Sequence, residues 1–150
     1  MNLKEKINLD LKDAMKSGDK LRLETIRSIR ALIIEFEKSG IGRDLTQEDE
    51  IKMLSTAVKK RKDSIEQFRN AGREELAQKE EKELEIILSY LPKQLNEEEV
   101  FVEVKRIAEE IGANSKEDFP KLMPLVMKEL KGKADGKVVK SQVEKYLNKS

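Results

Sequence analysis

The chemistry that this sequence offers most clearly is anion binding by lysines around a turn at residues 132–136. Four lysines lie in this turn or beside it: Lys131, Lys133, Lys137 and Lys140. We expect a helix to start here, and the free amide groups of a helix N-terminus favour phosphate oxygens. Alternatively, Asp135 already caps those amides and the lysines are only solvated. The sequence leaves both interpretations open.

The turn does not fit the phosphate-binding loop of nucleotide hydrolases. That motif follows a strand, has four residues between its glycines, and continues with Lys and then Ser or Thr. Only three residues separate Gly132 from Gly136, and Val138 stands where the hydroxyl residue would be. Nucleotide hydrolysis is therefore not expected.

The remaining side chains offer little for catalysis. The chain has no cysteine and no histidine, which excludes disulfides, thiolate nucleophiles and the usual general base near neutral pH. Glu80, Glu81, Glu83 and Glu85 lie beside lysines, and we expect them on a solvated helix face rather than as a catalytic pair. We expect no catalytic residues, no metal and no cofactor.

A second basic run is Lys59-Lys60-Arg61-Lys62. Consecutive helical residues point in different directions, which favours a solvated run over a binding patch. Arg61 interrupts an apolar stripe, so either its stem lies along the helix seam or its guanidinium pairs with an internal carboxylate. Because aromatic residues make up only 4% of the chain, any nucleic-acid contact should be mainly to the backbone.

Helices must position these groups, because apolar residues recur at helical spacing and no strand pattern occurs. We predict helices over residues 3–16, 20–38, 47–71, 73–90 and 97–111, one starting at Ser115 and Asp118, and one capped by Asp135. The predicted core includes Leu76 and Ile111. The fold class is all-α: an N-terminal four-helix bundle followed by a small C-terminal three-helix domain.

A domain boundary is expected at Leu91-Pro92-Lys93-Gln94-Leu95. Proline ends the preceding helix, and Asn96 with Glu99 forms a capping box for the next one. We therefore predict domains at 1–91 and 96–150, joined by a hinge at 92–95. With no signal peptide and no apolar stretch of membrane-spanning length, we expect a cytoplasmic protein without membrane contact.

The net charge of +1 conceals an uneven distribution. Residues 96–118 hold three basic and eight acidic residues, net −5, whereas residues 119–150 hold eight basic and three acidic residues, net +5. A basic surface attracts phosphate, and an acidic one nearby limits nonspecific binding.

Four stretches together resemble the YqeY family. They are Arg61-Lys62-Asp63-Ser64, Ala71-Gly72-Arg73, Tyr90-Leu91-Pro92-Lys93-Gln94-Leu95 and Gly132-Lys133-Ala134-Asp135-Gly136. That family is similar to the C-terminal region of GatB, a component of the tRNA-dependent amidotransferase whose helical and tail regions help to hold tRNA. The resemblance covers essentially the whole chain and implies a helical domain followed by a GatB/YqeY-like tail domain at 96–150.

The resemblance implies a noncatalytic tRNA-binding module with Lys131, Lys133, Lys137 and Lys140 as contact residues. Carbon–nitrogen ligase activity is associated with the family, but no residue here supports it in isolation. The alternatives are a protein-interaction adaptor and an accessory of an amidotransferase, or of another translation-related protein, that acts in trans. No DNA partner is expected.

Overall fold

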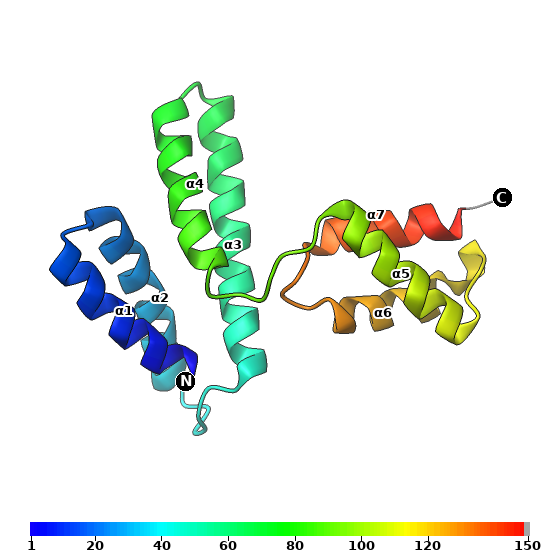
Figure 1. Cartoon of the computed structure of the whole chain (residues 1–150), viewed down its shortest axis with the longest axis horizontal. Helices are drawn as coiled ribbons and strands as arrows, with labels where there is room; N and C mark the ends of the chain where they lie inside the picture. The colour runs from blue at the N-terminus through cyan, green and yellow to red at the C-terminus, as the bar shows by residue number, and fades with distance from the viewer. Residues whose placement is uncertain (149–150) are drawn as a thin grey trace. The chain divides into compact units, whose positions relative to one another are not determined.

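The computed structural model describes residues 1–148, and that range contains helices and loops but no strand. The all-α prediction is confirmed. The α-helices are α1 (Leu3–Ser17), α2 (Lys20–Lys38), α3 (Gln47–Asn70), α4 (Glu74–Leu88), α5 (Glu97–Ile111), α6 (Phe119–Glu129) and α7 (Gly136–Leu147) (Figure 1). A short 3-10 turn, η1 (Lys116–Asp118), precedes α6.

The chain divides into two compact units, Met1–Leu91 and Pro92–Ser150. In the first unit, α1 lies along α2 and α3 lies along α4 (Figure 1). These pairs share one apolar core, whose buried residues are Leu3, Ile7, Ala14, Ile26, Ile29, Ile33, Leu54, Val58 and Ile87. The turn that joins α3 to α4 extends away from α1 and α2 (Figure 1).

The second unit encloses a core of its own between α5, α6 and α7. Its buried residues include Val100, Val104, Leu122, Val126, Val139 and Val143. Each of these three helices contributes residues at spacings of three or four, so each presents one apolar stripe to the other two.

Side chains that the sequence predicts as caps fix where several helices begin. Asn96 and Glu99 form a reciprocal capping box at α5, and Thr46 and Asp49 form one at α3. Each box satisfies two backbone donors at the helix start, which explains why these boundaries can be recognised locally.

Three burial predictions for these helices are wrong. Leu76 is 39% exposed and Ile111 is 42% exposed, although both were expected in the core. Glu83, expected on a solvated face, is buried at 8%. Leu76 and Glu83 belong to the α3–α4 hairpin, where burial depends on which neighbouring helix covers each side. The spacing of apolar residues in the sequence does not reveal which helix that is.

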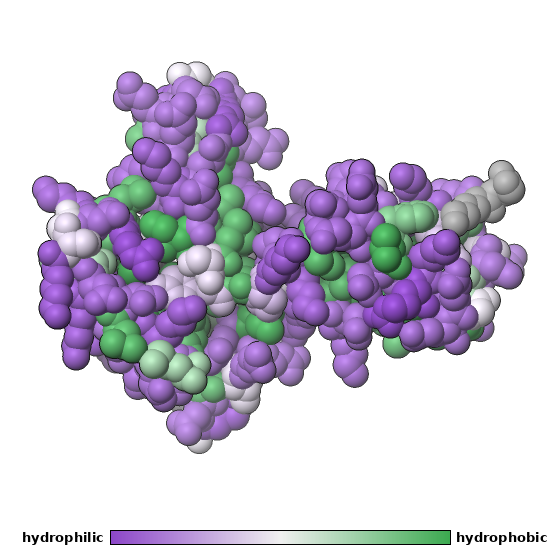
Figure 2. Space-filling view, in the orientation of Figure 1, coloured by the Kyte–Doolittle hydropathy of each residue, from purple (hydrophilic) through white to green (hydrophobic). Residues whose placement is uncertain are grey.

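Hydrophilic residues cover most of the visible surface of each unit (Figure 2). Within residues 1–148, no helix combines the length and hydrophobicity needed to cross a membrane.

Candidate functional site

Two sequence motifs meet in the second unit: the segment before α5 and the turn before α7. The side-chain amide of Gln94 donates a hydrogen bond of 2.6 Å to the Gly132 carbonyl. The backbone N–H of Leu95 donates one of 2.8 Å to the Lys133 carbonyl, and the Leu95 side chain packs against the core. The segment expected as a hinge is therefore bonded, at its last two residues, to the lysine-bearing turn.

The turn is fixed by its own backbone as well. Gly132 has a φ of 77°, a left-handed conformation that favours glycine. Lys133 then donates its N–H to the Leu130 carbonyl at 2.9 Å. Together with the two bonds from Gln94 and Leu95, this makes three hydrogen bonds that constrain the backbone at Gly132 and Lys133.

Asp135 caps α7. Its carboxylate accepts a hydrogen bond of 2.9 Å from the backbone N–H of Lys137. The bond agrees with one part of the alternative left open by the sequence, because the Lys137 amide already has an anionic partner inside the chain. An anion at this turn would have to compete with Asp135 for that amide.

The four predicted lysines are all exposed, and the structure places them along the turn and the first turns of α7. Lys140 lies at spacing i,i+3 from Lys137, so both project from the same side of α7. The Lys140 ammonium lies 3.9 Å from the Glu144 carboxylate, and both side chains are exposed. Such a pair contributes little stability, so it leaves the Lys140 ammonium available at low energetic cost.

Sequence reasoning missed Gln94 and the carbonyl of Gly132 as parts of this site. Their signal was present, because both lie in stretches that carry the family resemblance. Only the fold shows that a side chain before α5 reaches a carbonyl after α6.

The second basic run has a structural role at Arg61. Its Nε lies 3.2 Å from Glu83 Oε2 and 3.5 Å from Glu80 Oε2, both on the facing helix α4. Arg61 therefore pairs with internal carboxylates, as one of the two sequence alternatives held. Burial raises the pKa of Glu83, and the charge of Arg61 opposes that rise.

Similar pairs continue toward the end of the hairpin. Arg69 on α3 pairs with Glu74 at 3.4 Å and also with Glu81, both on α4. The two arginines thus join α3 to α4 at two places along the hairpin. Within the basic run at residues 59–62, Arg61 therefore stabilises the packing of α3 against α4.

Tyr90 anchors the end of the first unit. Its hydroxyl donates a hydrogen bond of 2.5 Å to Asp10 on α1, and the Lys6 ammonium lies 5.2 Å from the centre of its ring. Burial and the bond to Asp10 raise the pKa of Tyr90 above its ordinary value. The first residue of the motif at 90–95 therefore ties the chain after α4 to α1.

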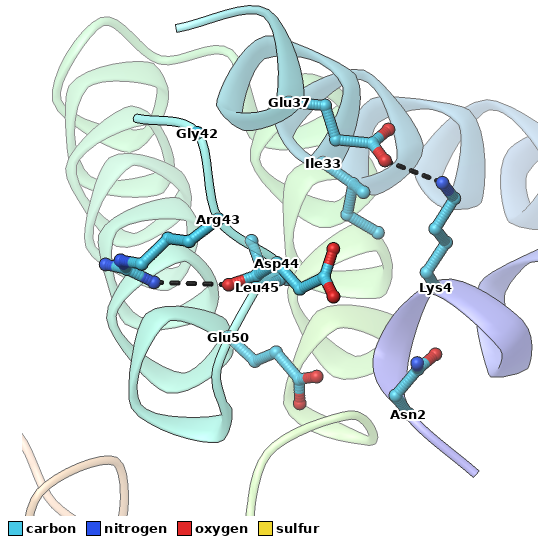
Figure 3. Close-up of a pocket in the computed structure, with 9 residues that line it drawn as sticks. All are labelled: Asn2, Lys4, Ile33, Glu37, Gly42, Arg43, Asp44, Leu45 and Glu50. Carbon is cyan, nitrogen blue, oxygen red and sulfur yellow. Dashed lines mark hydrogen bonds and ion pairs between the residues drawn. The ribbon is translucent and has the colours of Figure 1, made fainter. Parts of the chain in front are cut away.

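A cavity of about 400 Å³ lies where α1, α2 and α3 meet the loop before α3 (Figure 3). Its charged groups are largely engaged: Lys4 pairs with Glu37 at 2.6 Å, and Glu50 accepts the N–H of Leu3 at 3.3 Å. Among residues 1–148, no three His, Cys, Asp or Glu side chains are grouped to hold a metal ion. The lysine-bearing turn is thus the better candidate site.

Several curated relatives of this chain are fungal proteins named "Altered inheritance of mitochondria protein 41, mitochondrial". The one from Pyrenophora tritici-repentis is 32% identical over 95% of this chain and 79% of its own length. The relative from Lachancea thermotolerans is 42% identical over 55% of this chain, and the matched part makes up 44% of that relative's length. That from Kluyveromyces lactis is 32% identical over 90% of this chain and 70% of its own length.

These relatives contradict the expected cytoplasmic location, because all three are named as mitochondrial proteins. The expectation rested on apolar stretches, which report secretory signal peptides and membrane spans. Segments that direct proteins to mitochondria are amphipathic and rich in arginine and serine, so that criterion does not detect them.

The family model described as "Yqey-like protein" matches residues 4–147, nearly the whole length, and so includes α1 to α7. The four motifs, the all-helical fold and the similarity to the fungal relatives agree with this match. The chain belongs to the YqeY family.

Proposed function

We propose that this protein is a noncatalytic tRNA-binding module. It contacts the RNA backbone through Lys131, Lys133, Lys137 and Lys140. The observation that carries the proposal is the exposed lysine turn, held in place by Gln94 and Leu95. Further support comes from the family, which resembles the tRNA-holding tail of GatB in the amidotransferase.

The lysine side chains, rather than the amides of α7, supply the attraction in this proposal. Asp135 already accepts the Lys137 amide, so a phosphate placed there would face a carboxylate. Lysine ammonium groups on flexible stems can instead reach phosphates on either side of the turn. The hydrogen bonds that constrain the backbone at Gly132 and Lys133 limit the entropy that is lost on binding.

The proposal also assigns a role to each part of the chain. An N-terminal four-helix bundle precedes a three-helix, GatB/YqeY-like tail domain at 96–150, and the tail carries the RNA contact. Separate apolar cores in the two units support this organisation.

Charge reversal of the turn tests the proposal. Lys133→Glu with Lys137→Glu should weaken the binding of fluorescently labelled tRNA by about tenfold or more, because two phosphate contacts become repulsive. The matched control is Lys59→Glu with Lys60→Glu, since both lysines are exposed and the change in net charge is the same. Equal losses in the two variants, or no loss in the first, would remove the turn as the RNA site.

A further inference from the structure

The outer face of α6 combines apolar and basic residues in a way that the RNA proposal does not use. Pro120, Pro124 and Lys128 follow one another at a spacing of four, so they lie on one side of the helix. Lys121 and Met127 flank Pro124 at spacings of three. All five are exposed, whereas Leu122 and Val126 on the opposite side are fully buried. We call these five residues the α6 face.

The apolar part of the α6 face is stiff and accessible. Pro124 lies inside the helix and has no N–H to give to the Pro120 carbonyl. Two proline rings therefore present a rigid surface that loses little entropy when it is covered. Met127 is 41% exposed, and its terminal methyl is only 3.4 Å from where a Cβ at Gly136 would lie, so it contacts the start of α7.

The charge of the α6 face has one sign. The sequence from Phe119 to Lys128 contains no acidic residue. The next one, Glu129, lies 3.4 Å from Arg106 on α5 and is directed toward that helix. A ligand that covered the two prolines and Met127 would meet Lys121 and Lys128 on the helix itself. The Asp118 carboxylate, three residues before Lys121, already accepts hydrogen bonds from the N–H groups of Asn114 and Ser115.

We propose that the α6 face docks an acidic amphipathic helix of a partner protein. Apolar side chains of that helix would cover Pro120, Pro124 and Met127, and its carboxylates would pair with Lys121 and Lys128. Methionine is well suited to such a surface because its flexible thioether adapts to the partner's side chains.

Two other classes of partner fit the face less well. RNA phosphates would pair with the lysines but gain nothing from two prolines and a methionine lying between them. Helices that lie on lipid surfaces present broad faces of Trp, Phe or Leu. On α6, Leu125 is the one such side chain that is exposed, at 43%, whereas Phe119 and Leu122 pack into the core of the unit.

A synthetic peptide about five helical turns long tests the proposal, with leucines on one face and glutamates on the other. We expect the full-length protein to bind it in a fluorescence anisotropy titration at low salt. A second peptide with lysines in place of the glutamates should not bind. Failure of the acidic peptide to bind, or equal binding of both peptides, would overturn the proposal.

Variants then locate the binding. Met127→Glu with Lys128→Glu should weaken peptide binding by about tenfold, which corresponds to roughly 1.4 kcal/mol. The control, Val102→Glu with Lys105→Glu on α5, changes an exposed apolar residue and an exposed lysine in the same unit and should bind as the unchanged protein does. Circular dichroism of both variants checks that the helices remain folded.

A charge-only variant, Lys121→Glu with Lys128→Glu, keeps every apolar residue and should also lose peptide affinity. Equal losses in the α6 and α5 variants would reduce the effect to net charge and overturn the proposal. The proposal would also be overturned if the α6 variants lost binding to tRNA or to anionic vesicles while peptide binding was unchanged, since the α6 face would then bind RNA or lipid.

Discussion

At the scale of single residues, Arg61 shows how a charge inside an apolar stripe can be structural. The Arg61 side chain is 26% exposed and that of Glu83 only 11%, and the two belong to facing helices. Forming an ion pair that is so far removed from water costs desolvation energy. Removing one partner destabilises the protein further, because the other charge is then buried without a counter-charge. The pair therefore constrains the α3–α4 hairpin in a way that a solvated lysine does not.

Replacing Arg61 with Met should lower the free energy of unfolding by about 1–3 kcal/mol, between the values typical of exposed and buried pairs. The loss arises because the Glu83 carboxylate stays buried without its cation. Urea unfolding followed by circular dichroism measures it. Lys60→Met, at an exposed neighbour, should change stability by less than about 0.5 kcal/mol. Similar losses in both variants would contradict a special role for Arg61.

Glu83 should also make stability depend on pH. Burial raises its pKa in the folded protein above the unfolded value of 4.5, so the folded state binds the proton more tightly. This contribution is fully present below the unfolded pKa and is lost as pH rises through the folded pKa. Compared with Glu83→Gln, the unchanged protein should lose stability from about pH 4.5 upward. A stability difference between the two proteins that does not vary with pH would contradict this assignment.

At the scale of helices and turns, the connection between residues 94–95 and 132–133 organises the second unit. Two hydrogen bonds join segments that lie 38 residues apart in the chain. The Gly132 carbonyl can accept the Gln94 amide because its backbone turns through a left-handed conformation. The geometry of the lysine turn thus depends on glycine at this position.

Gly132→Ala should therefore destabilise the protein by about 1–2 kcal/mol, because a Cβ disfavours the left-handed region. It should also reduce tRNA affinity, since the turn that presents Lys133 would relax. Thermal unfolding and RNA titration provide the two measurements.

Gly136→Ala is the matched control for Gly132→Ala. Gly136 has no positive φ, and an added Cβ would meet only the flexible end of Met127 at 3.4 Å. This variant should keep both stability and RNA affinity. If Gly132→Ala behaved in the same way, the left-handed turn would not be what positions the lysines.

The sequence predicted helix starts better than it predicted burial. The capping boxes at Asn96 and Thr46 are local signals, because donor and acceptor are three residues apart. Leu76 and Glu83 were misplaced because their burial depends on how far α1 and α2 reach along the α3–α4 hairpin. The lysines of the site were visible in the sequence, whereas the bond from Gln94 to Gly132 required the fold.

At the scale of the whole molecule, charge is divided between two parts of one small unit. Residues 96–118 carry a net charge of −5 and residues 119–150 a net charge of +5. Such a division lets a basic surface attract a polyanion while the acidic part repels it elsewhere, which favours one orientation of binding. The proposed tRNA contact uses the basic part, and the lysines of the α6 face lie within it.

The measurement that tests the RNA proposal most directly is titration of labelled bulk tRNA with the full-length protein over a series of salt concentrations, with duplex DNA as the control. Contact of three to four lysines with phosphates predicts that log K falls against log salt with a slope of about −3. We expect binding at micromolar concentrations or tighter that is stronger for tRNA than for DNA. Absence of binding at low salt, or equal affinity for tRNA and duplex DNA, would contradict the proposal.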